Sequence, residues 1–244
     1  MKILIADIGN TSAHLALCRG KRILKELRLK TDSLQNSGSI IRRFIGKEKI
    51  EKTAFASVVP QAAARFKTII QKNIGIKCLQ IGKDISVPVG NRARYPKQVG
   101  IDRLLNALAA HKKIKGAAIV VDFGTAITFD IISAKGEYLG GVIAPGIEIT
   151  LDALSQRTAL LPKIKLKHPA SRIGRDTVEC IRIGSSVGIG GLCDRIIEEI
   201  AKSFKSKPAV LATGGYAQFM KRYSKYIRVI DSHLTLRGIL LSIT

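Results

Sequence analysis

Two segments of the chain share one pattern of apolar and polar positions. In residues 3–17 and 118–132, an apolar run is followed by an aspartate, an apolar residue, a glycine and small hydroxyl residues, and then by a second apolar run. Short runs rich in Ile, Val and Leu predict strands. The glycine two positions after the aspartate lets the backbone turn sharply where the first strand ends. Each segment is therefore predicted to form a strand, a tight turn and a second strand.

The elements that follow the two turns also repeat. The first half predicts a three-stranded meander, a helix, a strand and a further helix, at residues 3–6, 13–18, 23–29, 40–45, 53–57 and 62–71. The second half predicts strands and a helix in the same order, at residues 118–121, 127–132, 138–143 and from 148 onward. Residues 53–67 and 209–223 both predict a short strand, a turn of small residues and an amphipathic helix. This repetition indicates a duplicated fold.

The length of the chain fits this duplication. Its 244 residues suffice for two domains of about 120 residues, each able to bury a core. A helix predicted over residues 102–113 is followed by Lys115 and Gly116, where we place the boundary. The expected domains are residues 1–115 and 116–244.

The two turns have the chemistry of a phosphate site. Backbone N–H groups at a glycine turn can approach phosphate oxygens closely, whereas a carboxylate needs a cation between itself and a phosphate. Asp7 and Asp122 are therefore interpreted as metal-facing groups. The neutral donors are expected from Gly9, Asn10, Thr11, Gly124 and Thr125. One such turn alone is typical of an ordinary hairpin, but two copies between apolar runs favour a nucleotide-dependent phosphotransferase.

Composition adds one alternative. With 41 Lys and Arg against 18 Asp and Glu, the formal charge is +23, which would attract nucleic acid. The basic residues are dispersed, aromatic residues make up only 5% of the chain and Trp is absent, so base-stacking platforms are scarce. We expect a solvated basic surface, and a basic nucleic-acid-binding protein is the alternative.

The apolar runs and the cysteines indicate where in the cell the protein is located. No apolar run approaches the roughly 18 to 20 residues that a bilayer needs, and Asp7 interrupts the N-terminal run before it could act as a secretory segment. Cys18, Cys78, Cys180 and Cys193 are widely separated and suggest neither a zinc site nor a disulfide framework. We expect a cytoplasmic protein with reduced thiols and no membrane association.

A third segment, GIDR at Gly100 to Arg103, places an acidic side chain next to a basic one. Asp102 lies at the start of the predicted helix, where the helix dipole and Arg103 should keep it ionised and able to accept a proton. An N-cap role is the alternative for Asp102. Arg103 could hold a substrate carboxylate in a bidentate pair, or it could form a structural salt bridge.

Five motifs in order resemble the type III pantothenate kinases, in the superfamily of acetate kinase, sugar kinases and actin. They are DIGNT, GIDR, DFGTA, GGVIAPG and LTLRG, which begin at Asp7, Gly100, Asp122, Gly140 and Leu234. The resemblance covers essentially the whole chain. One departure is Leu104, where the family commonly has Trp.

The resemblance implies a fold and an activity. The fold is α/β, with two similar ribonuclease H-like (actin-like ATPase) domains, each a mixed five-stranded sheet with flanking helices, and an active site in the cleft between them. The activity is ATP-dependent phosphorylation of pantothenate to 4'-phosphopantothenate, the first step of coenzyme A biosynthesis. The implied cofactors are ATP with Mg²⁺ and a monovalent cation, K⁺ or NH₄⁺.

The resemblance also implies the roles of individual residues. The general base on the substrate hydroxyl is Asp102. ATP contacts are expected from Asp7, Ile8, Gly9, Asn10, Thr11, Ser12, Ala13, His14 and Thr125. Pantothenate contacts are expected from Tyr95, Gly100, Ile101, Asp102, Arg103 and Thr177. Asp122 is the expected ligand of the monovalent cation, and Asp7 is expected to position magnesium through water.

Two further statements follow from the family. Its members are homodimers in which Thr177 reaches the site of the partner subunit, so a homodimer is expected. The Bvg accessory factor also resembles this family, so a non-catalytic, transcription-related accessory factor is an alternative to the kinase. The presence of Asp7, Asp102 and Asp122 favours the enzyme, because a pure binding module has no chemical need for all three.

Overall fold

The computed structural model describes all 244 residues and divides them into two compact units. The first unit consists of Met1–Lys113, Gly136–Tyr138 and His233–Thr244. The second unit consists of Ile114–Lys135 and Leu139–Ser232. The first unit thus includes two short segments that follow residue 115 in the chain.

The first unit is built on a five-stranded mixed sheet with the order β3-β2-β1-β4-β5. Its strands are β1 (Lys2–Ile8), β2 (Ser12–Arg19), β3 (Arg22–Lys30), β4 (Lys52–Ser57) and β5 (Cys78–Gln80). Its helices are η1 (Thr31–Asn36), α1 (Gly38–Ile45), α2 (Pro60–Ile74), η2 (Pro96–Gln98), α3 (Ile101–Ile114) and α8 (Leu234–Ile243). The meander β1-β2-β3 is antiparallel, as predicted, and β4 runs parallel to β1.

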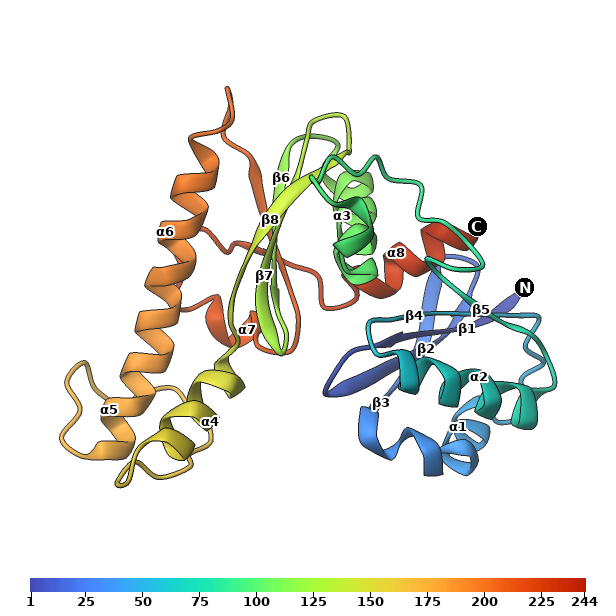
Figure 1. The fold of residues 1–244 in the computed structure, drawn as a ribbon, viewed down its shortest axis with the longest axis horizontal. Helices are drawn as coiled ribbons and strands as arrows, with labels where there is room; N and C mark the ends of the chain where they lie inside the picture. The colour runs from blue at the N-terminus through green and yellow to red at the C-terminus, as the bar shows by residue number, and fades with distance from the viewer. The chain divides into compact units, whose positions relative to one another are not determined.

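Both faces of the first sheet are covered, which explains the continuous apolar run of β1. Side chains alternate between the faces of a strand. Leu4, Ala6 and Ile8 accordingly belong to a core shared with α1 and α2. Ile3 and Ile5 belong to a second core shared with α3 and α8 (Figure 1). A doubly covered sheet fixes the end of β1, and with it the predicted first turn.

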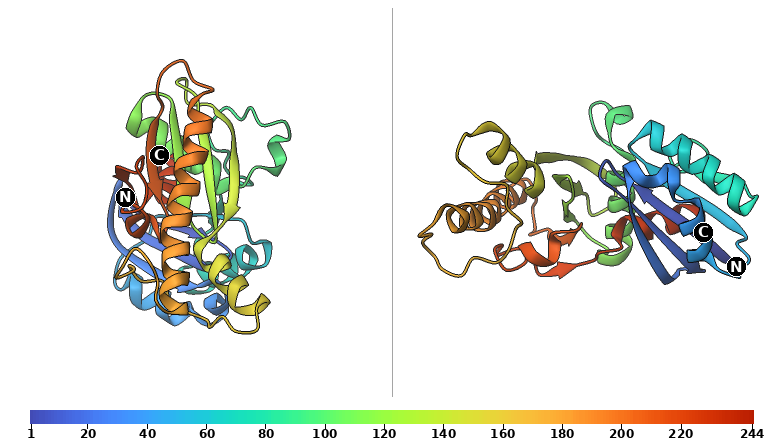
Figure 2. Two further views of the ribbon diagram at one scale, coloured as in Figure 1. Left: turned by 90° about the vertical axis from the view of Figure 1, so that its left-hand side faces the viewer. Right: turned by 90° about the horizontal axis from the view of Figure 1, so that it is seen from below.

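The second unit contains a five-stranded sheet with the order β10-β9-β6-β7-β8. Its strands are β6 (Ala118–Phe123), β7 (Ala126–Ile132), β8 (Tyr138–Pro145), β9 (Ala209–Thr213) and β10 (Val229–Ile230). Its helices are α4 (Ile147–Arg157), α5 (Thr177–Ile183), the π-helical turn η3 (Gly184–Gly188), α6 (Ile189–Ala201) and α7 (Ala217–Met220). Helix α6 packs along one face of this sheet, as both views of Figure 2 show.

The two sheets have the same topology, which confirms the predicted duplication. Each has a meander of three consecutive strands, and a fourth strand pairs in parallel with the first strand of that meander. The predicted equivalence of residues 53–67 and 209–223 is also present, as β4 with α2 and β9 with α7, although α7 has only four residues. No helix is both long enough and apolar enough to cross a bilayer.

Candidate active site

The first predicted phosphate turn joins β1 to β2 at Gly9–Thr11. The N–H of Gly9 donates to the carbonyl of Ser12 at 2.9 Å, which closes the turn. From outside the turn, Thr31 Oγ1 donates to the Gly9 carbonyl at 2.7 Å, and the N–H of Thr31 donates to the Thr11 carbonyl at 3.0 Å. Thr31 is buried, so its two hydrogen bonds connect the turn to the core of the unit. The exposed part of the turn therefore has a fixed conformation.

The residues of the predicted ATP segment differ in their exposure to solvent. Asn10, Thr11 and Ser12 are exposed, and Asp7 is half-buried at the end of β1. Ile8 and Ala13 are buried core residues. Exposed turn residues can meet a ligand with their side chains, whereas the buried pair serves to place the turn.

His14, the last residue of the predicted ATP segment, has a partner that sequence reasoning missed. Its Nε2 lies 2.6 Å from Glu26 Oε2, and His233 Nε2 lies 2.6 Å from Glu26 Oε1. Burial, reinforced by the charge of Arg28, lowers the pKa of His14 below its usual 6.5 despite the nearby carboxylate. Burial alone would raise the pKa of Glu26, but the two histidines together lower it. The antiparallel pairing of β2 with β3 brings His14 close to Glu26. His233 joins them from the start of α8, which packs against β1 and β4.

The second turn joins β6 to β7 and meets the end of β9. Asp122 lies opposite Thr213 in the parallel pair of β6 and β9. The next residue, Gly214, has φ +91°, and a Cβ placed on it would lie 2.5 Å from Asp122 Oδ1 and 2.6 Å from the Phe123 backbone. Only glycine has both this conformation and this close an approach. The structure thus brings the aspartate turn and the predicted Gly-Gly turn into one place.

Helix α4 begins directly behind this second turn. A Cβ on Gly146 would overlap the carbonyl oxygen of Thr125 and would lie 2.8 Å from that of Gly124. Gly146 precedes the first residue of α4 in extended conformation. The motif GGVIAPG therefore ends in a glycine because the helix start lies against the turn. Gly124 and Thr125 themselves are exposed, as a phosphate-binding turn requires.

The GIDR segment forms the first turn of α3. The N–H of Arg103 donates to Asp102 Oδ1 at 2.9 Å, and Asp102 is half-buried. Burial raises the pKa of Asp102 above 3.8, outweighing the opposing effects of Arg103. The sequence suggested that the helix dipole and Arg103 would dominate; desolvation is the larger effect. A raised pKa makes a carboxylate a better proton acceptor while it remains ionised.

Arg103 and Tyr95 both have cation–aromatic contacts. The guanidinium carbon of Arg103 lies 5.6 Å from the centre of the Tyr138 ring, and that of Arg94 lies 5.4 Å from the Tyr95 ring. Tyr95 is 57% exposed in the loop before η2, and Ile101 packs at the edge of the core formed with α8. Tyr138 is fully buried and was not identified from the sequence, where it is one strand residue among several.

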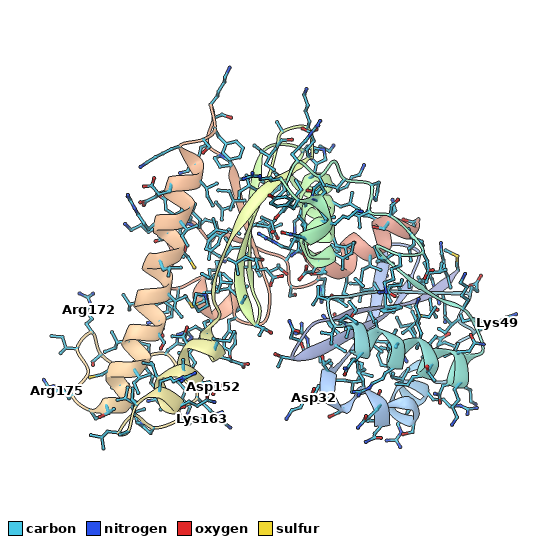
Figure 3. All side chains as sticks on the ribbon, in the orientation of Figure 1. Asp32, Lys49, Asp152, Lys163, Arg172 and Arg175 are labelled. Carbon is cyan, nitrogen blue, oxygen red and sulfur yellow. The ribbon has the colours of Figure 1, made fainter.

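Thr177, the remaining predicted substrate contact, is in the second unit. It is the exposed first residue of α5, after Asp176, whose Oδ1 caps the helix by accepting from the N–H of Glu179 at 2.8 Å. A surface pocket beside it is lined by Ala170, Ser171, Arg172, Ile173, Arg175, Asp176 and Glu179. Figure 3 shows Arg172 and Arg175 extending outward from this loop.

The other charged residues near this loop form a surface contact. Asp152 Oδ1 and Lys163 Nζ lie 2.8 Å apart, with 43% and 75% of their side chains exposed, and Figure 3 shows them together. Exposed pairs of this kind contribute little to stability. In both units together, no group of three or more His, Cys, Asp or Glu side chains is arranged to hold a metal ion.

Comparison with known proteins places these features in a family. A family model described as type III pantothenate kinase matches residues 3–199. A type III pantothenate kinase of Finegoldia magna is 38% identical, with 97% of this chain and 95% of that protein aligned. One from Geobacter sulfurreducens is 35% identical, with 97% and 96% aligned.

Solved structures agree in fold. A Campylobacter jejuni protein described as a candidate Baf family transcriptional activator is 26% identical, with a TM-score of 0.63 over 98% of this chain and 96% of that one. Component A of the (R)-2-hydroxyglutaryl-CoA dehydratase of Acidaminococcus fermentans is 13% identical, with a TM-score of 0.56 over 99% and 96%. That likeness shows the fold alone, and it confirms the expected two-domain, actin-like ATPase fold. With a family model matching most of the sequence and relatives above 30% identity aligned almost end to end, the chain belongs to the type III pantothenate kinase family.

Proposed function

We propose that this protein transfers the γ-phosphoryl group of ATP to the hydroxyl of pantothenate, producing 4'-phosphopantothenate in the first step of coenzyme A biosynthesis. Beyond family membership, the observation that carries the proposal is the Asp102 carboxyl, which is desolvated, has a raised pKa and lies beside Arg103. Phosphoryl transfer needs a carboxylate that takes the proton of the acceptor hydroxyl as the new bond develops. Asp102 is the general base.

The substrate is an anion, and the residues around Asp102 suit it. Arg103 holds the pantothenate carboxylate, because a planar guanidinium matches a carboxylate in a bidentate pair. Tyr95 offers an exposed ring in the same unit, and Gly100 and Ile101 supply backbone at the start of α3. This arrangement leaves Asp102 for the hydroxyl at the other end of the substrate.

Each of the two turns offers donors for ATP. Asn10, Thr11 and Ser12 in the first turn and Thr125 in the second are exposed and can donate to phosphate oxygens. Asp7 fits the role of positioning Mg²⁺ through water, because magnesium keeps several waters and uses few protein carboxylates in nucleotide sites. Bound magnesium would neutralise charge on the transferred group.

The test is a coupled assay of ADP release with ATP, Mg²⁺, K⁺ and pantothenate. ADP release is expected to depend on pantothenate, and mass spectrometry should find the vitamin with one added phosphoryl group. Omission of pantothenate is the control. Failure to detect pantothenate-dependent release would favour the accessory-factor alternative, which the likeness to the Campylobacter jejuni protein keeps open.

A monovalent cation is the second cofactor that we propose. Asp122 supplies a carboxylate oxygen where β6 and β9 end, and Gly214 lets the backbone approach this oxygen closely. K⁺ or NH₄⁺ is expected to raise the rate over Na⁺ or Li⁺ at constant ionic strength. The Asp122→Asn variant should lose this preference. Equal rates of the parent protein in all four salts would contradict the assignment.

A homodimer completes the proposed site through Thr177. Several apolar side chains near α5 and α6 are exposed, among them Ile173 at 79%, Val187 at 54% and Leu192 at 40%. An apolar surface pocket lies between α4, α5 and α6. Exposed apolar side chains beside an apolar pocket suit a protein interface. In the dimer, Thr177 would reach the pantothenate site of the partner subunit.

The proposed location is the cytoplasm, where ATP is available and thiols stay reduced. All four cysteines are free, and burial raises the pKa of Cys18, Cys78 and Cys193 to about 11 or 12, so these thiols are unreactive. The basic surface attracts anionic ATP and pantothenate. A nucleic-acid partner is not proposed, because no structural feature specifically supports one.

A further inference from the structure

We propose that Tyr138 is a positioning residue for substrate recognition, which orients the guanidinium of Arg103 toward the carboxylate of pantothenate. The inference rests on the proposed function and adds a specificity determinant to it. Tyr138 is the first residue of β8 and lies outside all five sequence motifs that indicated the family.

The contact itself is the first observation. The guanidinium carbon of Arg103 lies 5.6 Å from the centre of the Tyr138 ring, within the roughly 6 Å over which a cation is attracted to an aromatic face. The ring is 1% exposed, so it is desolvated and has little freedom to move. A long arginine side chain resting on an immobile ring loses rotamers that it would otherwise occupy. The guanidinium is thereby prepared for one direction of binding.

The backbone of Tyr138 is held by the loop that precedes η2. The N–H of Tyr138 donates to the Gly90 carbonyl at 2.8 Å, and the N–H of Arg92 donates to the Tyr138 carbonyl at 2.8 Å. Asn91, between them, forms a parallel bridge with Tyr138. This loop continues to Tyr95, the other aromatic residue of the proposed pantothenate site. One strand residue therefore anchors both the loop and the arginine.

The neighbours of Tyr138 reinforce this placement. Arg92 donates from Nε and Nη2 to Glu137 Oε1, at 2.8 and 2.5 Å. Gly136 has φ +83°, and a Cβ on it would lie 2.5 Å from the His111 ring on α3. Gly136, which belongs to the first unit, thus lies against the same helix that carries Asp102 and Arg103. Residues 136–138 belong to the first unit, although β7 belongs to the second.

The position of the ring suggests a specific effect on recognition. Arg103 pairs with the anionic end of the substrate, whereas Asp102 acts on the hydroxyl at the other end. Loss of the ring should let Arg103 adopt other rotamers and weaken binding of the carboxylate. The chemical step, which depends on Asp102, should change little. Affinity for ATP should be unaffected.

The experiment compares Tyr138→Phe, which keeps the ring, with Tyr138→Leu and Tyr138→Met, which replace it by aliphatic groups. Loss of one partly desolvated cation–aromatic contact corresponds to a rise of roughly 5- to 10-fold in KM for pantothenate. The Leu and Met variants should show this rise, with kcat within about twofold of the parent and KM for ATP unchanged. The Phe variant keeps the ring and should show no comparable rise in KM for pantothenate. Circular dichroism and thermal unfolding identify any variant that fails to fold.

A charge-free substrate separates orientation of Arg103 from general damage to the site. For the pantothenate analogue with a primary alcohol in place of the carboxylate, the Leu and Met variants should match the parent. In a double-mutant cycle, Arg103→Gln should abolish the effect of Tyr138→Leu on pantothenate binding. Additive effects would show that Tyr138 acts independently of Arg103 and would overturn the proposal, as would an unchanged KM in folded Leu and Met variants.

Calorimetric binding of pantothenate distinguishes this inference from the proposed function. If the parent binds pantothenate without turning it over, the kinase assignment fails, and the ratio of dissociation constants for the Leu variant and the parent still tests Tyr138. A ratio near one would overturn the positioning role. If the parent neither binds nor phosphorylates pantothenate, both proposals fail.

Discussion

Replacing Asp102 with asparagine is expected to lower kcat for pantothenate phosphorylation by about 10²- to 10⁴-fold, the range that a positioned general base contributes. Asparagine has nearly the same shape, and its Oδ1 can still accept from the N–H of Arg103, as the carboxylate does at 2.9 Å. The start of α3 should therefore persist. ATP binding, measured by calorimetry with a non-hydrolysable analogue, should be unchanged. Turnover equal to that of the parent would exclude Asp102 as the base.

The pH dependence of the parent should report the same group. Because burial raises the pKa of Asp102, the acid limb of kcat/KM should lie above the ordinary value of 3.8. Activity falls as the pH drops through that raised pKa, since the base becomes protonated. The residual rate of the Asp102→Asn variant should lack this limb.

The Asp102→Asn substitution lowers activity but should not lower thermal stability. A carboxyl whose pKa is higher in the folded than in the unfolded state destabilises the fold when it is ionised at neutral pH. Asp102→Asn should therefore unfold at the same temperature as the parent or at a higher one. Asp152→Asn is the matched control, because Asp152 forms an exposed pair with Lys163 and has no proposed catalytic role. Its activity should equal that of the parent.

Replacing Gly146 with alanine is expected to reduce affinity for ATP by at least about tenfold and to destabilise the second unit by about 1 to 3 kcal/mol, as overpacking commonly does. The added methyl group would overlap the carbonyl of Thr125 and lie 2.8 Å from that of Gly124. These are backbone atoms, so they cannot rotate away as a flexible side chain would. Either the second turn or the start of α4 must shift.

Gly191→Ala provides the control for this substitution. Gly191 lies within α6, and a Cβ there would meet no atom within 4 Å. Alanine is the better helix former, so this variant should be neutral or stabilised by about 0.5 to 1 kcal/mol. Equilibrium binding of an ATP analogue and thermal unfolding should be measured for both variants. If Gly146→Ala bound the nucleotide as tightly as the parent, the second turn could not be a rigid phosphate site.

The sequence predicted the strand-turn-strand units, because their signals are local. A short apolar run and a glycine two positions after the aspartate are properties of neighbouring residues, and β1 with β2 and β6 with β7 formed where they were expected. The sequence did not show where the helices after residue 177 begin and end. There, the structure contains α5, the π-helical turn η3 and α6 in succession.

The electrostatics of the candidate base could be judged only in part. From the sequence, the helix start and the adjacent arginine were visible, and both favour an ionised Asp102. Desolvation depends on how residues distant in sequence bury the carboxyl, and it raises the pKa instead. The partnership of His14 and His233 with Glu26 was hidden for the same reason.

The sequence by itself determined the duplicated architecture, the phosphate-type turns and the family. These depend on the order of residue types along the chain and on backbone conformations set by near neighbours. The tertiary structure alone decided that α8 joins the first unit, that Gly146 lies against Thr125 and that Tyr138 lies against Arg103. Such contacts join positions remote in sequence and arise from how strands and helices fill a core, so no local pattern encodes them.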